Sequence, residues 1–300
     1  MHPTAQPDVI CVGAVLWDII GRSEKPMKFG NDVPGRIVRT PGGVALNIAI
    51  ALARAGLVPT LLSVIGQDAE GDELIAACHR LGLRTDHLHR TTELPTDQYM
   101  AVEDANGLVA AIADARSLEA AGPQILQALV DGRLGTQTQP WHGVIALDGN
   151  LTSALLEDIA HSPLFAAADL RVAPASPGKA ERLLPLLRHP RVTFYVNLEE
   201  AGLLCARTFA DAPTAAQGLL DRGVPRVLVT DGARDSCDGR RGEEIVSARP
   251  PPVAIRRVTG AGDTFMAGHI AAEVRGADRP GALTAALAAA SAHVAGEIGS

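Results

Sequence analysis

Cysteine and aromatic residues are both scarce in this 300-residue chain. Aromatic residues make up 3% of it, so a core of 47% hydrophobic composition must be built mainly from Leu, Val, Ile and Ala. The four cysteines, Cys11, Cys78, Cys205 and Cys237, show no CxxC spacing and no clustering with histidines. This pattern excludes a disulfide scaffold and a cysteine-based zinc site, and is typical of reduced thiols in a cytoplasmic protein.

Positive charge is also in short supply, and long apolar runs are missing. Lys and Arg number 27 against 34 Asp and Glu, which gives a net charge of −7. An acidic balance argues against nucleic acid or an anionic membrane as the main partner. The chain has no apolar stretch long enough to span a bilayer and no basic region followed by an apolar run at its start. We therefore expect a cytoplasmic protein.

Several well-known functional motifs do not occur. The pair Gly178-Lys179 lacks an upstream glycine at P-loop spacing and is followed by Ala180. The glycine pair Gly260-x-Gly262 lies near the end of the chain and has Phe265 where a dinucleotide fingerprint needs a third glycine. The absence of a G-x-S-x-G elbow disfavours a hydrolase.

Short β-rich runs alternate with Ala- and Leu-rich segments of helical period. This order predicts one α/β domain over residues 1–300, with a mostly parallel sheet covered by helices on both faces. The predicted strands are residues 9–12, 60–65, 144–147, 170–173, 192–196 and 227–230, and the predicted helices are residues 44–55, 70–81, 153–160, 179–187, 199–206, 214–222, 263–274 and 283–295.

Two segments interrupt the alternation, at about residues 16–40 and 96–114. The second contains two short β-patterned runs joined through Asn106-Gly107, a strong hairpin signal. Both flank candidate site residues, so we expect a small β-sheet lid inserted into the domain. The alternative is that they are surface excursions without a gating role.

A glycine loop followed by a carboxylate opens the predicted helix at residues 263–274. In Gly260-Ala261-Gly262-Asp263, the glycines let backbone amides converge, and the helix start adds unsatisfied donors. Such a loop can hold a phosphate while Asp263 accepts a proton from an attacking hydroxyl. A tight strand-to-helix turn with an acidic first turn is the alternative.

A second glycine pair, Gly42-Gly43, opens the predicted helix at residues 44–55 and is followed by Asn47. The pair lets a polar ligand approach the backbone, and the amide of Asn47 can both donate to and accept from hydroxyl groups. Asp18 follows the first strand, near the edge where open α/β sheets bind ligands. Helix entry and a turn carboxylate are the plainer interpretations of these residues.

Two further strand ends carry polar residues. Asn197 and Glu200 are spaced i, i+3, which suits contacts to phosphate and magnesium-bound water, although helix capping by Asn197 is an equal alternative. Thr230 and Gly232 close a wholly apolar strand and are candidates for nucleotide phosphate contacts.

Over essentially its whole length, the chain resembles the ribokinase-like (PfkB) carbohydrate kinases. The resemblance rests on three motifs in this order: Gly42-Gly43…Asn47, Asn197-x-x-Glu200 and Gly260-Ala261-Gly262-Asp263. The resemblance implies a three-layer α/β/α sandwich with a β-sheet lid. It also implies ATP-dependent, Mg²⁺-assisted phosphorylation of a sugar or nucleoside hydroxymethyl group.

The resemblance is compatible with a homodimer formed through the lid. It also implies a role for each matching residue. It implies Asp263 as the base, Gly260, Ala261 and Gly262 as the anion hole, Asp18, Gly42, Gly43, Asn47 and Asn150 as sugar contacts, Asn197, Glu200, Thr230 and Gly232 as nucleotide contacts, and Glu200 as a water-mediated magnesium ligand.

Within the family, the segments at residues 34–49 and 258–263 most resemble the pseudouridine kinases, so pseudouridine is the expected acceptor. A free sugar or another nucleoside is the alternative, followed by a non-catalytic sugar- or nucleotide-binding regulator. Leu16 and Asp235 depart from common family residues, which puts one hydroxyl contact and the detailed nucleotide pocket in question. Arg257 stands where many relatives have an acid that helps bind a monovalent cation, so we expect little potassium dependence.

Overall fold

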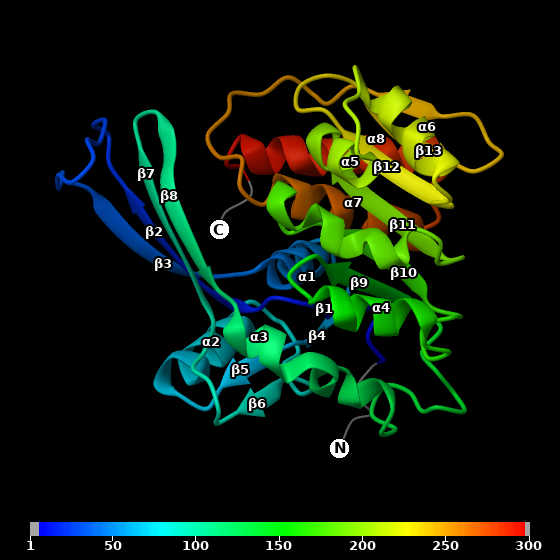
Figure 1. Ribbon diagram of the computed structural model, residues 1–300, viewed down its shortest axis with the longest axis horizontal. Helices are drawn as coiled ribbons and strands as arrows, with labels where there is room; N and C mark the ends of the chain where they lie inside the picture. The colour runs from blue at the N-terminus through cyan, green and yellow to red at the C-terminus, as the bar shows by residue number, and fades with distance from the viewer. Residues whose placement is uncertain (1–5, 298–300) are drawn as a thin grey trace.

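The computed structural model describes residues 6–297. Its main sheet has eight strands in the order β14-β13-β12-β11-β10-β9-β1-β4 (Figure 1). Neighbours from β4 to β12 are parallel, and β13 and β14 continue the sheet antiparallel. The strands are β1 (Val9–Val12), β4 (Pro59–Leu62), β9 (Val144–Asp148), β10 (Asp169–Ala173), β11 (Val192–Asn197), β12 (Arg226–Thr230), β13 (Ser236–Arg240) and β14 (Val246–Ala248).

Successive strand residues enter two separate cores, one on each face of the sheet. In β1, Ile10 and Val12 pack in one cluster while Val9 and Cys11 pack in the other. This alternation follows from the pleat of a strand buried on both faces. The predicted three-layer α/β/α architecture is therefore confirmed.

Helices from different parts of the chain cover the two faces. The cluster of Val9 includes residues of α1 (Val44–Arg54), α2 (Ala69–Arg80), α7 (Ala261–Val274) and α8 (Arg279–Val294). The opposite cluster includes residues of α3 (Arg116–Ala121), η1 (Gly122–Leu129), α4 (Ser153–His161), η2 (Pro177–Leu186), α5 (Leu198–Cys205) and α6 (Ala212–Asp221).

The two interrupting segments form a separate four-stranded sheet in the order β3-β2-β7-β8. Figure 1 shows it as an arm beside the main body. The hairpin between β7 and β8 turns where Asp104 pairs with Gly107, whose φ of +112° suits glycine. The strands are β2 (Leu16–Arg22), β3 (Arg36–Gly42), β7 (Gln98–Asp104) and β8 (Gly107–Asp114).

Two predicted elements were wrong in detail. Residues 60–65 form two strands, β4 and β5 (Val64–Gly66), separated at Ser63, whose hydroxyl donates to the Gly13 carbonyl at 2.5 Å. β5 pairs with β6 (His89–Thr91) in a sheet of its own. Residues 179–187 lie largely in the 3₁₀ helix η2, whose Pro185 has no N–H to donate to a regular α-helical bond.

Candidate active site

The glycine loop at the start of α1 is shaped by close approaches from two neighbouring segments. A Cβ at Gly42 would lie 2.0 Å from Oδ2 of Asp18, and one at Gly43 would lie 2.4 Å from the Ala14 carbonyl oxygen. Gly43 also has a φ of +96°. Gly43 therefore has to be glycine, whereas a side chain at Gly42 would displace the Asp18 carboxylate, which lies directly against the loop.

Asp148, which the sequence analysis did not single out, joins three elements at this edge of the sheet. Its side chain is fully buried at the end of β9. Oδ2 accepts hydrogen bonds from the amides of Ala14 at 2.8 Å and Ala45 at 3.0 Å, and Oδ1 accepts from Asn150 at 2.7 Å. Burial raises the pKa of this carboxyl group, and the three hydrogen bonds from backbone amides oppose that rise. Asp148 therefore fixes the ends of β1 and β9 to the start of α1.

The two predicted site loops meet through a direct side-chain contact. Asn47 Nδ2 donates to Asp263 Oδ2 at 2.9 Å, although the residues are 216 positions apart. Asp263 lies in the first turn of α7. Burial raises its pKa to about 7, the bond from Asn47 opposes this rise, and the nearby carboxylates Asp148, Asp18 and Glu200 reinforce it. A carboxyl group with this pKa can exchange protons near neutral pH.

Asp18, at the base of the lid strand β2, is also electrostatically perturbed. Burial raises the pKa of its carboxyl group to about 6. It pairs across the lid sheet with Thr40 and Tyr99. Asp18, a predicted acceptor contact, is thus part of the lid sheet, and its carboxylate lies against Gly42.

The predicted anion hole lies at the N-terminus of α7. Gly260 is the N-cap residue, has a φ of +83° and makes no side-chain capping bond. The amide of Ala261 donates to the Val258 carbonyl at 3.1 Å, which is a turn hydrogen bond. A phosphate binding here would have to compete for that amide, whereas the helix start offers further amides of its first turn.

Asn197 and Glu200 form a reciprocal capping box at the start of α5. Asn197 Oδ1 accepts from the Glu200 amide at 2.8 Å, and Glu200 Oε2 accepts from the Asn197 amide at 2.9 Å. Burial raises the Glu200 pKa to about 7. Asn197 therefore caps the helix, as the alternative interpretation predicts. Asn197 Nδ2 and Glu200 Oε1 remain outside the capping box.

A cavity of about 760 Å³ adjoins the predicted nucleotide contacts. Its wall includes Asn197, Thr230 and Gly232 at the ends of β11 and β12, together with apolar residues of α5 such as Leu203. Gly232 has a φ of +58°, and a Cβ at this position would meet no atom within 4 Å. Asp235, the departure noted above, pairs with Arg249 at 2.6 Å.

Lys179, which the sequence analysis considered only for a P-loop motif, contacts the predicted site residue Asn150. Its Nζ donates to Asn150 Oδ1 at 2.7 Å, and burial lowers its pKa. It lies in η2, directly after β10, and β10 lies between β9 and β11 in the sheet. The sequence signal that could have identified Lys179 is its position directly after a strand whose two neighbours in the sheet both end in predicted site residues.

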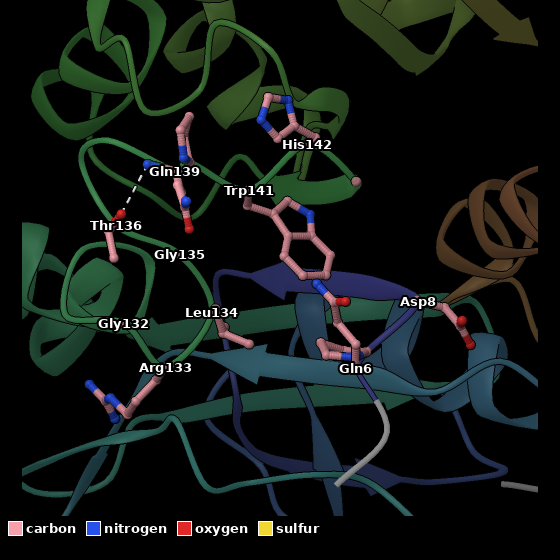
Figure 2. A pocket seen from close by; sticks show the side chains of 13 residues that line it. Gln6, Asp8, Gly132, Arg133, Leu134, Gly135, Thr136, Gln139, Trp141 and His142 are labelled. Carbon is pink, nitrogen blue, oxygen red and sulfur yellow. Dashed lines mark hydrogen bonds between the residues drawn. The ribbon is translucent and has the colours of Figure 1, made fainter. Parts of the chain in front are cut away.

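A second hollow, of about 530 Å³, lies near the amino-terminal ends of β1 and β9 (Figure 2). It is lined by residues that precede β1 and β9, among them Gln6, Asp8 and Trp141. None of the predicted site residues lines it, so it lies apart from the predicted site.

Within residues 6–297, no group of three or more His, Cys, Asp or Glu side chains is arranged to bind a metal ion. In the same part of the chain, no helix is long and apolar enough to cross a membrane.

The chain is similar to known proteins over most of its length. The sequence pattern of the pfkB family carbohydrate kinases matches residues 6–297. An uncharacterized sugar kinase of Escherichia coli is 31% identical over 276 residues, covering 89% of this chain and 72% of its own. The pseudouridine kinase of the same organism is 27% identical over 268 residues, covering 87% and 82%.

A solved structure gives the same fold. Arabidopsis thaliana ribokinase, solved with ribose and ATP, superposes with a TM-score of 0.79 at 22% identity, covering 98% of this chain and 94% of its own.

Proposed function

The chain belongs to the pfkB family of carbohydrate kinases, and from that premise we propose that it transfers the γ-phosphate of ATP to the 5′-hydroxyl of pseudouridine. The observation that carries the proposal is the 2.9 Å hydrogen bond between Asn47 and Asp263. It joins the loop proposed to hold the acceptor to the proposed base. Membership makes the chain a carbohydrate or nucleoside kinase, and the pseudouridine kinase among its relatives supports the narrower acceptor.

In the proposed reaction, the acceptor lies between the lid and the glycine loop of α1. Asp18, Gly42, Gly43, Asn47 and Asn150 hold its hydroxyl groups. The acceptor oxygen attacks the γ-phosphorus of ATP, the bond from that phosphorus to ADP breaks, and the hydroxyl proton passes to Asp263.

Positioning supplies most of the proposed rate enhancement. In this proposal the amides of Gly260, Ala261 and Gly262 at the N-terminus of α7 donate to the transferring phosphoryl oxygens, and the Ala261 amide exchanges its turn bond to the Val258 carbonyl for this contact. Asn47 fixes the orientation of Asp263 through its hydrogen bond. Closure of the lid over the acceptor would exclude water and so suppress ATP hydrolysis.

The nucleotide is proposed to bind at the ends of β11 and β12. Thr230 and Gly232 contact its phosphates, Asn197 Nδ2 donates to a phosphate oxygen, and Glu200 would hold Mg²⁺ through water. The donor set fits this ion, since Oε1 of the Glu200 carboxylate lies outside the capping box and can accept from a metal-bound water. When bound, Mg²⁺ would neutralise phosphate charge.

Arg257 supports the expectation of little potassium dependence. Its Nε donates to the His293 carbonyl at 3.2 Å, and its backbone amide donates to the Val294 carbonyl at 3.2 Å. A positive charge therefore already lies against the His293 carbonyl oxygen near the end of α8. We propose that the guanidinium group takes the place of a monovalent cation.

The lid also supports a homodimer. The lid-sheet face that carries Ile19 in β2 also carries Ile37, Met100 and Ile112, because these residues are paired or two apart along their strands. Ile37 is 77% exposed and Ile112 is 64% exposed. We propose that these exposed apolar side chains, or the adjacent strand edges, pack against a second copy of the chain.

A free sugar is the second candidate acceptor, supported by the sugar kinase that is 31% identical to this chain. The deciding experiment measures ADP formation from Mg²⁺-ATP with pseudouridine, uridine, adenosine, ribose and fructose, each with and without potassium. We expect pseudouridine to give the highest kcat/KM, with little change on adding potassium. A higher value for ribose or fructose would overturn the nucleoside assignment, and strong potassium activation would overturn the role given to Arg257. Absence of ADP formation with every acceptor would favour a binding regulator.

A further inference from the structure

The C-terminal end of α8 is tied to the segment that precedes the glycine loop of α7. The backbone amides of Arg256 and Arg257 donate to the Val294 carbonyl at 2.9 and 3.2 Å. The Arg257 guanidinium adds a bond from Nε to the His293 carbonyl at 3.2 Å. These contacts place the side chain of His293 beside the loop.

The imidazole of His293 bridges two parts of this segment. Nε2 lies 2.8 Å from the Thr259 carbonyl oxygen, and Nδ1 lies 2.9 Å from Nη2 of Arg257. A carbonyl oxygen only accepts and a guanidinium group only donates, so Nε2 carries the proton and Nδ1 is an acceptor. The ring is therefore neutral in this arrangement. The Thr264 hydroxyl is also 3.1 Å from Nδ1.

The bond to the Thr259 carbonyl determines the direction of the next amide. The Thr259 carbonyl and the Gly260 N–H belong to one planar trans peptide, in which the two groups point in opposite directions. A carbonyl held toward His293 therefore turns the Gly260 N–H away from α8. The Gly260 carbonyl is fixed in turn by the Thr264 hydroxyl at 2.9 Å.

Packing reinforces this orientation. A Cβ at Gly260 would lie 3.2 Å from Cε1 and Nε2 of His293, so the ring edge lies directly against the glycine. Gly260 has a φ of +83° and no side chain of its own to restrain it. Without the imidazole, the peptide between Thr259 and Gly260 would lose both a hydrogen bond and a packing surface.

We propose that His293 is a positioning residue that aims the Gly260 amide at the transferring phosphoryl group. The inference rests on the proposed function, because the amide matters to the rate only if a phosphoryl group is transferred beside it. His293 acts through the loop and does not touch the substrates. Its contribution belongs to the transition state, so it affects kcat more than the KM of the acceptor.

The test compares His293→Leu with His293→Gln. Leucine keeps bulk but has no polar atom, whereas the glutamine amide can donate to the Thr259 carbonyl and accept from Arg257. We expect His293→Leu to lower kcat about tenfold or more with acceptor KM changed by less than about threefold. We expect His293→Gln to recover most of the lost rate. Equal losses in the two variants, or an unchanged kcat in His293→Leu, would overturn the proposal.

Amide hydrogen exchange of residues 258–263 gives a readout independent of turnover. We expect exchange in this loop to be faster in His293→Leu and close to wild type in His293→Gln. Ser291→Ala is the matched control, because the Ser291 hydroxyl joins the same helix to the Pro251 carbonyl at 3.3 Å, away from the glycine loop. If wild type transfers no phosphate yet His293→Leu loosens the loop, the proposed function fails while the structural link stands. Unchanged exchange in His293→Leu would overturn the link itself.

Discussion

Asp263 lies among other carboxylates, and this crowding has measurable consequences. Burial raises its pKa to about 7, and Asp148, Asp18 and Glu200 add to the rise. The bond from Asn47 acts in the opposite direction because it favours the ionised carboxylate. The protonation of the proposed base is thus controlled by groups from four segments of the chain.

The pH dependence of kcat/KM follows from this pKa. We expect activity to fall on the acid side with a midpoint near pH 7, because Asp263 must be ionised to accept the hydroxyl proton. Asn47→Ala removes the bond that lowers the pKa, so its midpoint should move to higher pH. The check is a pH–rate profile of kcat/KM for the acceptor in both proteins. A wild-type midpoint below about pH 5, near the ordinary value for Asp, would contradict the assignment.

The raised pKa also predicts that the ionised Asp263 carboxylate destabilises the folded protein. Because the folded-state pKa lies above the unfolded value of 3.8, the folded protein holds more protons between about pH 4 and 7, and stability falls as pH rises through that range. Asp263→Asn should therefore melt higher than wild type at pH 8. Because Asp263 is only partly buried, solvent screens this effect, and we expect the variant to gain about 1 kcal/mol in the free energy of unfolding, or about 2 °C in melting temperature.

Calorimetry of the two proteins from pH 4 to pH 8 measures this difference. The gap in melting temperature should close toward pH 4, where the unfolded carboxyl also takes up its proton. A variant that is less stable than wild type at pH 8 would show that the carboxylate is stabilised by its surroundings rather than strained by them.

At the scale of elements, Asp148 joins β1, β9 and α1. Asp148→Ala leaves three amides without their acceptor, and we expect a loss of about 2 kcal/mol in the free energy of unfolding together with a higher acceptor KM. Thr152→Ala, four residues further on, removes only the N-cap bond of α4 and should cost about 1 kcal/mol. Urea unfolding measures both. A loss no larger in Asp148→Ala than in the control would refute the role of Asp148.

The predictable elements were those with a strong local pattern. Apolar runs identified β1, β9, β10, β11 and β12, and glycine pairs identified the starts of α1 and α7, because each signal lies within a few residues. β13 was missed because buried Asp238 and Gly239 interrupt its apolar pattern. The Asp238 carboxylate is accommodated by an ion pair with Arg226 at 2.7 Å, a partner that only the folded sheet supplies.

For the proposed site, the sequence motifs singled out Asp18, Asn47 and Asp263, but they did not predict the hydrogen bond from Asn47 to Asp263. Asp148 was missed because a carboxylate at a strand end resembles an ordinary turn residue until its three amide donors are known. Such long-range contacts leave no periodic signal in the chain.

At the scale of the whole molecule, the lid stands as an arm beside the three-layer body (Figure 1). Ile37 and Ile112 lie on one face of it and are largely exposed. We expect the protein to be a dimer, and the double variant Ile37→Lys, Ile112→Lys to be a folded monomer, because like charges on this face would oppose its packing against a second copy. Light scattering coupled to gel filtration measures the mass. A monomeric wild type, or a double variant that still dimerises, would contradict the proposed interface.

The most direct measurement of the central claim is single-turnover phosphoryl transfer from Mg²⁺-ATP to pseudouridine by wild type and by Asp263→Asn. The account predicts formation of ADP and a nucleoside 5′-phosphate by wild type. It predicts a rate lower by a factor of about 10²–10⁴ in the variant, with ATP affinity retained. Near wild-type transfer by Asp263→Asn would contradict it.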